Sequence, residues 1–189
     1  MARITLVTPV VNAALRQVRF DDAPPDATAA RRAGAAAGAL PRHDVIFTAP
    51  SERCRGTASA LGLDAAVAPE LRDLDVGRWR GRSLDDVGRQ APQEVADWLA
   101  DPAAAPHGGE SLLELVERIG AWLEAWSGRE RRVLAVAEPA VVRAALVHAL
   151  AIPARTFWRL DVAPLTATEL SGRSGRWNLR CGRPLAASR

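Results

Sequence analysis

Lysine is absent from this chain of 189 residues, and histidine, cysteine and methionine are rare. All 25 basic residues are therefore arginine, and against 22 acidic residues they leave a formal net charge of +3. A nucleic-acid-binding surface usually needs a clustered basic stripe with interleaved aromatic residues, and the sequence contains no such stripe. We therefore expect the arginines to lie on a solvated surface, and we predict no nucleic-acid partner.

Patterns for metal binding and membrane insertion are also missing. Cys54 and Cys181 are far apart and belong to no Cys-x-x-Cys or Cys/His group, which argues against a zinc-finger type of site. We expect two free thiols in a reducing cytosol, with a single disulfide as the alternative. No run of about 18 apolar residues occurs. Pro9 and Asn12 interrupt the apolar N-terminal stretch, which is not typical of a secretory signal. The prediction is a cytoplasmic protein without membrane contact, metal or cofactor.

The residues that are present are typical of a globular α/β protein. Hydrophobic residues make up 48% of the chain and charged residues 25%, and the length fits a single domain over residues 1–189. Short β-branched runs alternate with longer helical patterns, which favours an α/β layer fold with a largely parallel sheet. The predicted strands are Ile4–Val7, Val45–Thr48, Val133–Ala137, Leu165–Leu170 and Arg176–Arg180. The predicted helices are Asp26–Ala39, Ser51–Leu61, Leu84–Arg89, Pro92–Ala100, Ser111–Trp126 and Ala140–Leu150.

The clearest helix start is at Ser111. Glu114 follows three residues later, and the pair predicts a capping box. One face of this helix is predicted to be core and contains Leu112, Leu115, Val116, Ile119, Leu123 and Trp126. Trp122 is expected at the edge of that face. Trp79 stands in a Gly-rich loop and is therefore the tryptophan most expected to line a pocket.

Five segments, taken in chain order, carry a resemblance to a known family. They are Ile4–Val7, the run from Val45 to Ala58, the loop from Leu71 to Gly81, Gly108–Ser111, and the strand, turn and helix from Val133 to Leu150. In this order and spacing they resemble the histidine phosphatase superfamily, the fold of cofactor-dependent phosphoglycerate mutases and α-ribazole phosphatases. The resemblance covers nearly the whole chain. It implies a phosphoglycerate mutase-like, three-layer α/β/α sandwich with a mostly parallel central sheet.

The same resemblance shows where this sequence departs from the family's chemistry. That chemistry needs a nucleophilic histidine, two arginines and a second histidine around the phosphoryl group, and a carboxylic acid for the leaving group. The family's Arg-His-Gly is replaced by Thr8, Pro9 and Val10. Glu138 occupies the position implied for the second histidine. Arg53 matches the family's second phosphate-binding arginine. Asp73 stands at the position of the family's acid, which is usually a Glu.

Other polar residues are candidates for the cleft. Ligands of open α/β sheets bind beyond the carboxyl ends of the strands, so His107 is a candidate for the cleft rim. Asn12 and Glu110 are candidate ligand contacts. Alternatively, Asn12 forms hydrogen bonds with backbone groups of its own turn, and Glu110 is a favourable negative charge in the first turn of a helix. His43 and His148 are expected to be structural or solvent-facing.

These observations leave several functional hypotheses. The first is a pseudoenzyme that has lost phosphohistidine chemistry and binds a partner, or a small molecule other than a simple phosphomonoester. In this hypothesis Arg53 forms a salt bridge with Glu138 across the former phosphate site. The second is a repurposed enzyme in which Glu138 and Asp73 act as acid and base or as metal ligands. The third is a residual phosphatase-like hydrolase, and a homodimer is a further hypothesis about partners.

Overall fold

A six-stranded sheet forms the centre of the computed structural model, which describes residues 1–173 and 175–184, without the side chains of 181–184. The strand order is β3-β2-β4-β1-β5-β6. The first four strands pair in parallel, whereas β5 is antiparallel to both β1 and β6. The predicted mostly parallel sheet is therefore confirmed. The strands are β1 Ala2–Val7, β2 Val45–Thr48, β3 Ala66–Val67, β4 Arg132–Val136, β5 Thr166–Arg173 and β6 Arg176–Pro184.

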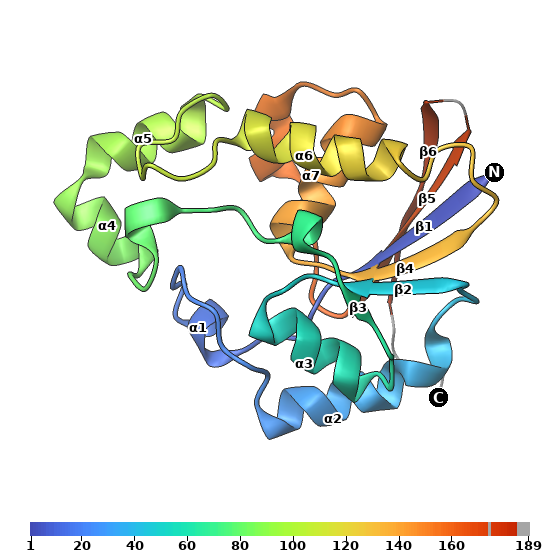
Figure 1. The fold of residues 1–189 in the computed structure, drawn as a ribbon. Helices are drawn as coiled ribbons and strands as arrows, with labels where there is room; N and C mark the ends of the chain where they lie inside the picture. Colours follow the sequence, from blue (N-terminus) through green and yellow to red (C-terminus); the bar gives the residue numbers. More distant parts are fainter. Residues whose placement is uncertain (174, 185–189) are drawn as a thin grey trace.

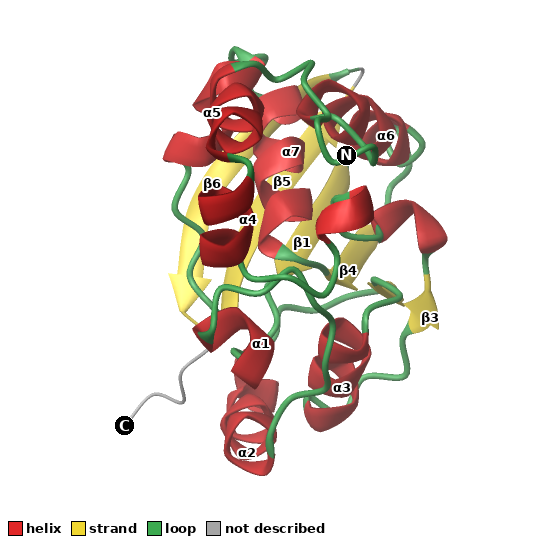
Figure 2. Cartoon of the chain, turned by 90° about the vertical axis from the view of Figure 1, so that its left-hand side faces the viewer, coloured by secondary structure: helices red, strands yellow, loops and turns green. Residues whose placement is uncertain are grey.

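Helices cover both faces of this sheet, and the predicted three-layer arrangement is confirmed (Figure 1). Helices α2 and α3 pack together on one face, whereas α6 and α7 pack together on the other. Helices α4 and α5 follow one another beside this second layer (Figure 2). The α-helices are α1 Ala13–Arg16, α2 Ala27–Ala36, α3 Glu52–Ala60, α4 Leu84–Gln90, α5 Pro92–Ala100, α6 Leu112–Glu124 and α7 Pro139–Ala149. The short 3-10 helices are η1 Ala37–Ala39, η2 Pro69–Leu71, η3 Gly77–Trp79 and η4 Ala154–Arg159.

The central strands are apolar on both faces because helices cover both faces. In the parallel pair β1 and β4, Ile4 lies opposite Val133 and Leu6 lies opposite Ala135, and all four side chains are buried. Strands buried on both sides need continuous apolar runs rather than alternation. This requirement explains why these strands were identifiable from the sequence.

The capping box predicted at the start of α6 is present. Ser111 Oγ accepts a hydrogen bond from the backbone N–H of Glu114 at 3.2 Å, and Glu114 Oε2 accepts one from the backbone N–H of Ser111 at 2.7 Å. Most of the predicted apolar face is buried in the core. Trp122, expected at the edge of that face, is buried, whereas Trp126 is half-buried.

The structure also contains elements that the sequence did not predict. Strand β3 has two residues and α1 has four, so neither carries a recognisable periodic pattern. Strand β5 continues to Arg173 because it pairs with β6 along a hairpin. Cys54 is a free, buried cysteine, whereas the side chain of Cys181 lies outside the described residues.

Trp79 packs in an aromatic cluster and is fully buried, so the expectation of a pocket-lining tryptophan was wrong. Its ring centroid lies 5.3 Å from that of Trp98, 5.7 Å from Phe20 and 5.0 Å from His107. The cluster joins α5 to η3 and to the loop before α6. Through Phe20, which lies between α1 and α2, the cluster also connects this part of the chain to the N-terminal region.

Within the described part of the chain, none of the helices combines the length and the apolar character needed to cross a bilayer.

Candidate functional site

The candidate site lies where parallel strands β1, β2 and β4 end at the same edge of the sheet. Thr8 and Pro9 follow β1 directly. Arg53 lies in the first turn of α3, shortly after β2, and Glu138 lies between β4 and α7. Carboxyl ends of neighbouring parallel strands lie side by side, which brings residues from distant parts of the sequence together.

Arg53 and Glu138 form the expected ion pair across this edge. The Arg53 guanidinium donates from Nη2 to Glu138 Oε2 and, at 3.3 Å, from Nε to Oε1. Ser51 Oγ also donates to Glu138 Oε1 at 2.8 Å, and Cys54 Sγ lies 3.5 Å from the same oxygen. Both charged residues are buried, with 8% of Arg53 and 3% of Glu138 exposed. The carboxylate is therefore bound in a protein cage rather than open to a ligand.

The carboxylate of Glu138 sets the electrostatics of its neighbours. Burial lowers the pKa of Arg53, but the charge and hydrogen bonds of Glu138 outweigh this effect, and the pKa of the guanidinium is raised. Burial and the Glu138 charge together raise the pKa of the Cys54 thiol well above its usual value. Arg53 therefore remains a cation, and Cys54 remains a neutral thiol that lacks nucleophilic character.

Asp73 lies in the loop after η2 and interacts electrostatically with both members of the ion pair. Asp73 is exposed to solvent, and its carboxylate lies within the electrostatic reach of Glu138, Arg53 and Arg118. Loss of solvation, with the Glu138 charge as the second cause, raises the pKa of Asp73 to about 7. Arg143, on α7, is half-buried and also interacts electrostatically with Asp73. Asp73 is thus the site residue best suited to exchange a proton near neutral pH.

The raised pKa of Asp73 predicts a specific pH dependence of stability. In the folded state the carboxyl of Asp73 keeps its proton up to about pH 7, whereas the ordinary pKa of an aspartate is 3.8. At Asp73 the native protein therefore holds a proton that the unfolded protein has released, and the contribution of this residue to stability falls as the pH rises through the interval. We expect urea unfolding to show that the stability of the wild-type protein relative to Asp73→Asn decreases from about pH 4 to about pH 7. Parallel profiles for the two proteins would contradict the raised pKa.

The residues that follow β1 use their polar groups within the fold. Thr8 Oγ1 donates to the carbonyl of Ala163 at 2.7 Å and accepts from the backbone N–H of Thr166 at 3.0 Å. Asn12 caps α1, with its Oδ1 accepting from the backbone N–H of Leu15 at 2.9 Å and its Nδ2 donating to the carbonyl of Ala23 at 2.7 Å. Thr8, Pro9 and Asn12 are buried. Asn12 therefore forms hydrogen bonds with local backbone groups, as the alternative interpretation of this residue expected.

The three histidines lie away from the ion pair's hydrogen-bond network. His107 is 1% exposed, and its Nδ1 accepts from the backbone N–H of Gly109 at 3.0 Å, so it is a core residue rather than a rim residue. Burial lowers the pKa of His107. His43 contacts the carbonyl of Pro41, and His148 contacts Glu124. These contacts agree with the expectation that His43 and His148 are structural or solvent-facing residues.

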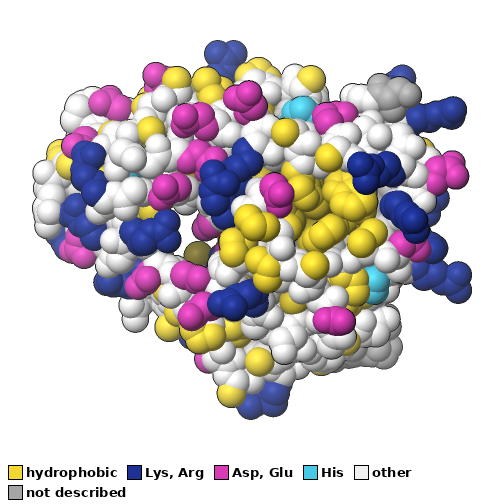
Figure 3. Space-filling model, viewed as in Figure 1, with side chains coloured by type: hydrophobic (Ala, Val, Ile, Leu, Met, Phe, Trp, Pro, Cys, Tyr) yellow, Lys and Arg dark blue, Asp and Glu magenta, His cyan; other side chains and the backbone are white. Residues whose placement is uncertain are grey.

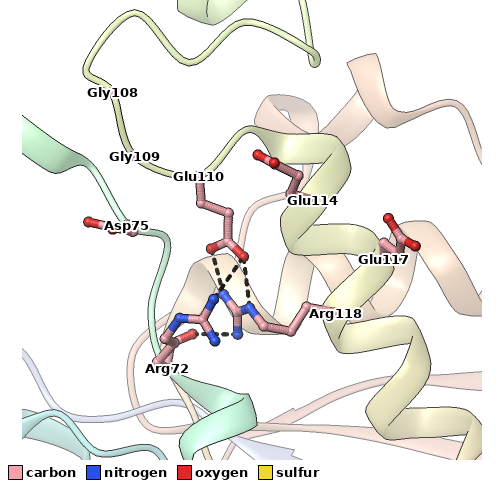
Figure 4. Close-up of a pocket in the computed structure, with 8 residues that line it drawn as sticks. All are labelled: Arg72, Asp75, Gly108, Gly109, Glu110, Glu114, Glu117 and Arg118. Carbon is pink, nitrogen blue, oxygen red and sulfur yellow. Dashed lines mark hydrogen bonds and ion pairs between the residues drawn. The ribbon is translucent and has the colours of Figure 1, made fainter.

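Glu110 belongs to a separate cavity of about 490 Å³ (Figure 4). Arg118 holds its carboxylate with two hydrogen bonds, from Nε at 2.7 Å and from Nη2 at 2.6 Å, and Arg72 lies 3.5 Å away. The cavity is lined by Arg72, Asp75, Gly108, Gly109, Glu110, Glu114, Glu117 and Arg118. Sequence reasoning did not identify Arg72 or Arg118. No local motif signals this pairing, because it depends on how α6 packs against the loop after η2.

A second cavity of about 130 Å³ lies near the turn that follows β1. Val10, Arg16, Asp26 and Pro164 are among its lining residues, and Arg16 pairs with Asp26 at 2.8 Å. Neither cavity is lined by Arg53, Glu138 or Asp73. Across the described part of the chain, no three His, Cys, Asp or Glu side chains are grouped in a way that would hold a metal ion.

The family assignment follows from this fold and from comparison with known proteins. The family model for the histidine phosphatase superfamily (branch 1) matches residues 10–182. The chain therefore belongs to the histidine phosphatase superfamily, as the sequence segments indicated. The matched range begins at Val10, immediately after Thr8 and Pro9.

Named relatives include enzymes and larger proteins. A bifunctional protein of Mycobacterium tuberculosis is 30% identical over 156 residues, which cover 74% of this chain and 41% of that protein. The chain thus spans about two fifths of the length of that relative. Glucosyl-3-phosphoglycerate phosphatase of the same species is 29% identical over 143 residues, covering 68% of this chain and 64% of the relative.

Solved structures agree with the assignment. The mycobacterial glucosyl-3-phosphoglycerate phosphatase in complex with VO3 superposes with a TM-score of 0.84 at 25% identity, covering 98% of this chain and 99% of that one. A putative α-ribazole-5′-phosphate phosphatase from Escherichia coli has a TM-score of 0.86 at 20% identity, covering 99% and 98% of the two chains. The phosphoglycerate mutase-like fold is therefore confirmed.

Proposed function

We propose that this chain uses the histidine phosphatase fold to bind a ligand or partner and does not hydrolyse phosphomonoesters through a phosphohistidine. The observation that carries the proposal is the buried Arg53–Glu138 ion pair. Arg53 is the residue that resembles the family's phosphate-binding arginine, and here a carboxylate of the protein occupies its hydrogen-bonding edge. The former anion site is thereby filled from within the chain.

The turn after β1 supports the same proposal. The resemblance places the nucleophilic histidine in this turn, but Pro9 has no side-chain nucleophile and the hydroxyl of Thr8 is bound to backbone groups. Loss of a nucleophile typically lowers turnover by ~10⁶. Moreover, the family match begins after both residues, at residue 10. The residues expected to perform the first chemical step are therefore replaced by residues that hold the turn.

The charge of the site also opposes a phosphate dianion. A carboxylate ~4 Å from a phosphoryl oxygen disfavours binding by ~4 kcal/mol at an effective dielectric constant of ~20. Glu138 occupies such a position beside Arg53, and Asp73 adds a second acid that is partly ionised near pH 7. With Arg53 and Glu138 paired to each other, a ligand in this region would meet the exposed acid of Asp73, which suits a cationic or zwitterionic group rather than a simple phosphomonoester.

A phosphatase assay tests the proposal directly. Wild-type protein is expected to hydrolyse para-nitrophenyl phosphate no faster than buffer, because the site has neither the nucleophile nor a free arginine. Arg53→Ala, measured in parallel, is expected to give the same background rate. Robust turnover by the wild-type protein that disappears in Arg53→Ala would overturn the proposal and support a residual phosphatase-like hydrolase.

The second candidate function is a repurposed enzyme, and the pKa of Asp73 favours it. A carboxylic acid with a pKa of about 7 can donate or accept a proton at neutral pH, and Glu138 would be the second acid of the pair. Thermal unfolding with a panel of divalent metals and small metabolites separates the hypotheses. A metal-dependent rise in melting temperature that disappears in Glu138→Gln would favour repurposed chemistry over simple ligand binding.

A further inference from the structure

The smaller of the two cavities, of about 130 Å³, has an apolar interior and a charged rim. The turn after β1, the end of α1, the start of α2 and the loop before β5 line it. Val10 and Ala29 are its most deeply buried lining residues, with 3% and 8% exposed. Val11, Pro164 and Leu165 extend the apolar lining toward the surface. The cavity can therefore hold a small apolar group partly away from water.

Two oppositely charged residues on the rim neutralise each other. Arg16, at the end of α1, donates from Nη2 to Asp26 Oδ2 at 2.8 Å. Asp26 also caps α2, because its Oδ1 accepts from the backbone N–H of Ala29 at 2.8 Å. Both charged side chains are exposed. Each carboxylate oxygen of Asp26 thus has a partner within the protein, so this aspartate is not a free acid for a cationic ligand.

Arg32 brings a further positive charge to the rim. Figure 3 shows that basic and acidic side chains stand beside one another over much of that face of the molecule. Among the described residues, however, no carboxylate pairs with Arg32, and its guanidinium donates no hydrogen bond to the protein. Arg32 follows Thr28 and Ala29 by about one turn of α2, so all three lie on the helix face that lines the cavity. With two arginines and one aspartate, the lining carries a formal charge of +1.

These features select a small anion that has a short apolar tail. Arginine presents its N–H groups as a planar fork that matches the two oxygens of a carboxylate. The cavity volume equals that of about four water molecules in the liquid, which suits a carboxylic acid of roughly two to four carbons. A phosphate dianion fits less well, because Asp26 opposes a second negative charge and the apolar lining donates no hydrogen bonds.

We propose that the smaller cavity binds a short-chain carboxylate. Arg32 binds the carboxylate group, and Val10 and Leu165 contact the hydrocarbon tail. The ion-pair site described above contributes no residue to this lining, so the binding does not rest on the function proposed for that site. Because Val10 directly follows Pro9, a bound carboxylate would also contact the turn after β1.

A two-dimensional NMR titration of isotope-labelled protein tests the proposal, with acetate, propionate and butyrate added at constant pH and ionic strength. Each carboxylate is expected to shift the backbone amide signals of Val10, Ala29 and Arg32 in a saturable way. The affinity is expected to rise by up to about fourfold for each added methylene that the cavity buries. Chloride and inorganic phosphate, at the same ionic strength, are expected to give no saturable shift of these signals.

Variants separate the contact with the carboxylate group from the contact with the tail. Arg32→Gln is expected to weaken the binding of all three carboxylates at least about tenfold, because it removes the charged donor. The matched control is Arg55→Gln, which removes the same charge from an exposed position on the neighbouring helix α3, outside the lining, and is expected to bind like the wild-type protein. Leu165→Ala is expected to weaken butyrate binding more than acetate binding, because it removes part of the apolar lining.

Three results would overturn the proposal. The first is a lack of saturable shifts with all three carboxylates. The second is an Arg32→Gln protein that binds them as tightly as the wild-type protein does. The third is binding of phosphate or chloride as tight as that of butyrate, because the cavity would then select for charge alone.

Discussion

Glu138→Ala is expected to lower the free energy of unfolding by about 3–5 kcal/mol, the usual cost of removing one partner from a buried ion pair. The guanidinium of Arg53 would remain buried without its carboxylate, and Ser51 Oγ would lose its acceptor. Since most single domains are stable by only ~5–15 kcal/mol, this loss would be large. Urea unfolding monitored by tryptophan fluorescence measures it.

The matched control is Asp85→Ala, which removes the acid from an exposed ion pair with Arg89. Exposed pairs contribute little to stability because water and salt screen them. We therefore expect little change for Asp85→Ala. If both substitutions had equally small effects, the Arg53–Glu138 pair would not be the buried, solvent-excluded contact described here.

The same Glu138→Ala protein should regain part of an anion site. Its Arg53 guanidinium loses its internal partner, and residue 138 directly precedes the N-terminus of α7, an end of a helix that favours anions. Inorganic phosphate or vanadate is therefore expected to raise the melting temperature of Glu138→Ala by mass action, with no effect on the wild-type protein. Equal responses of the two proteins would show that Glu138 does not block the anion site.

Trp79→Ala is expected to destabilise the protein by about 3–5 kcal/mol, as is typical when a buried tryptophan is truncated in a core. Trp79 is fully buried, and its ring contacts the rings of Phe20, Trp98 and His107. Its removal would leave a cavity between α5 and the loop before α6. Equilibrium unfolding in guanidinium chloride measures the change.

Leu99→Ala serves as the comparison for Trp79→Ala, because Leu99 is an apolar residue of α5 that is about half exposed. Surface substitutions away from caps and ion pairs usually change stability by less than ~0.5 kcal/mol. A similar loss for Leu99→Ala and Trp79→Ala would mean that the aromatic cluster does not contribute to the core.

The ion pair between Arg53 and Glu138 was predictable because the order of the segments carries topological information. Residues that follow neighbouring parallel strands must meet at one edge of the sheet. The resemblance identified those strands, and the structure places both residues at that edge. By contrast, the burial of His107 was not predictable. Its loop is rich in Ala, Pro and Gly and has no periodic apolar pattern, and the rings that pack against His107 come from Trp79 and Trp98 in other segments.

The sequence by itself determined the alternation of strands and helices, the capping box at Ser111 and the presence of Thr8, Pro9 and Val10 directly after the first strand. These features depend on residues that are close together in the chain, or on the identity of single residues. Only the tertiary structure decided that Asp73 has a raised pKa, that Glu110 pairs with Arg118 and that Phe47 meets Trp126 at the surface. Solvation and side-chain contact depend on distances between segments that are remote in sequence, and these distances exist only after the layers have packed.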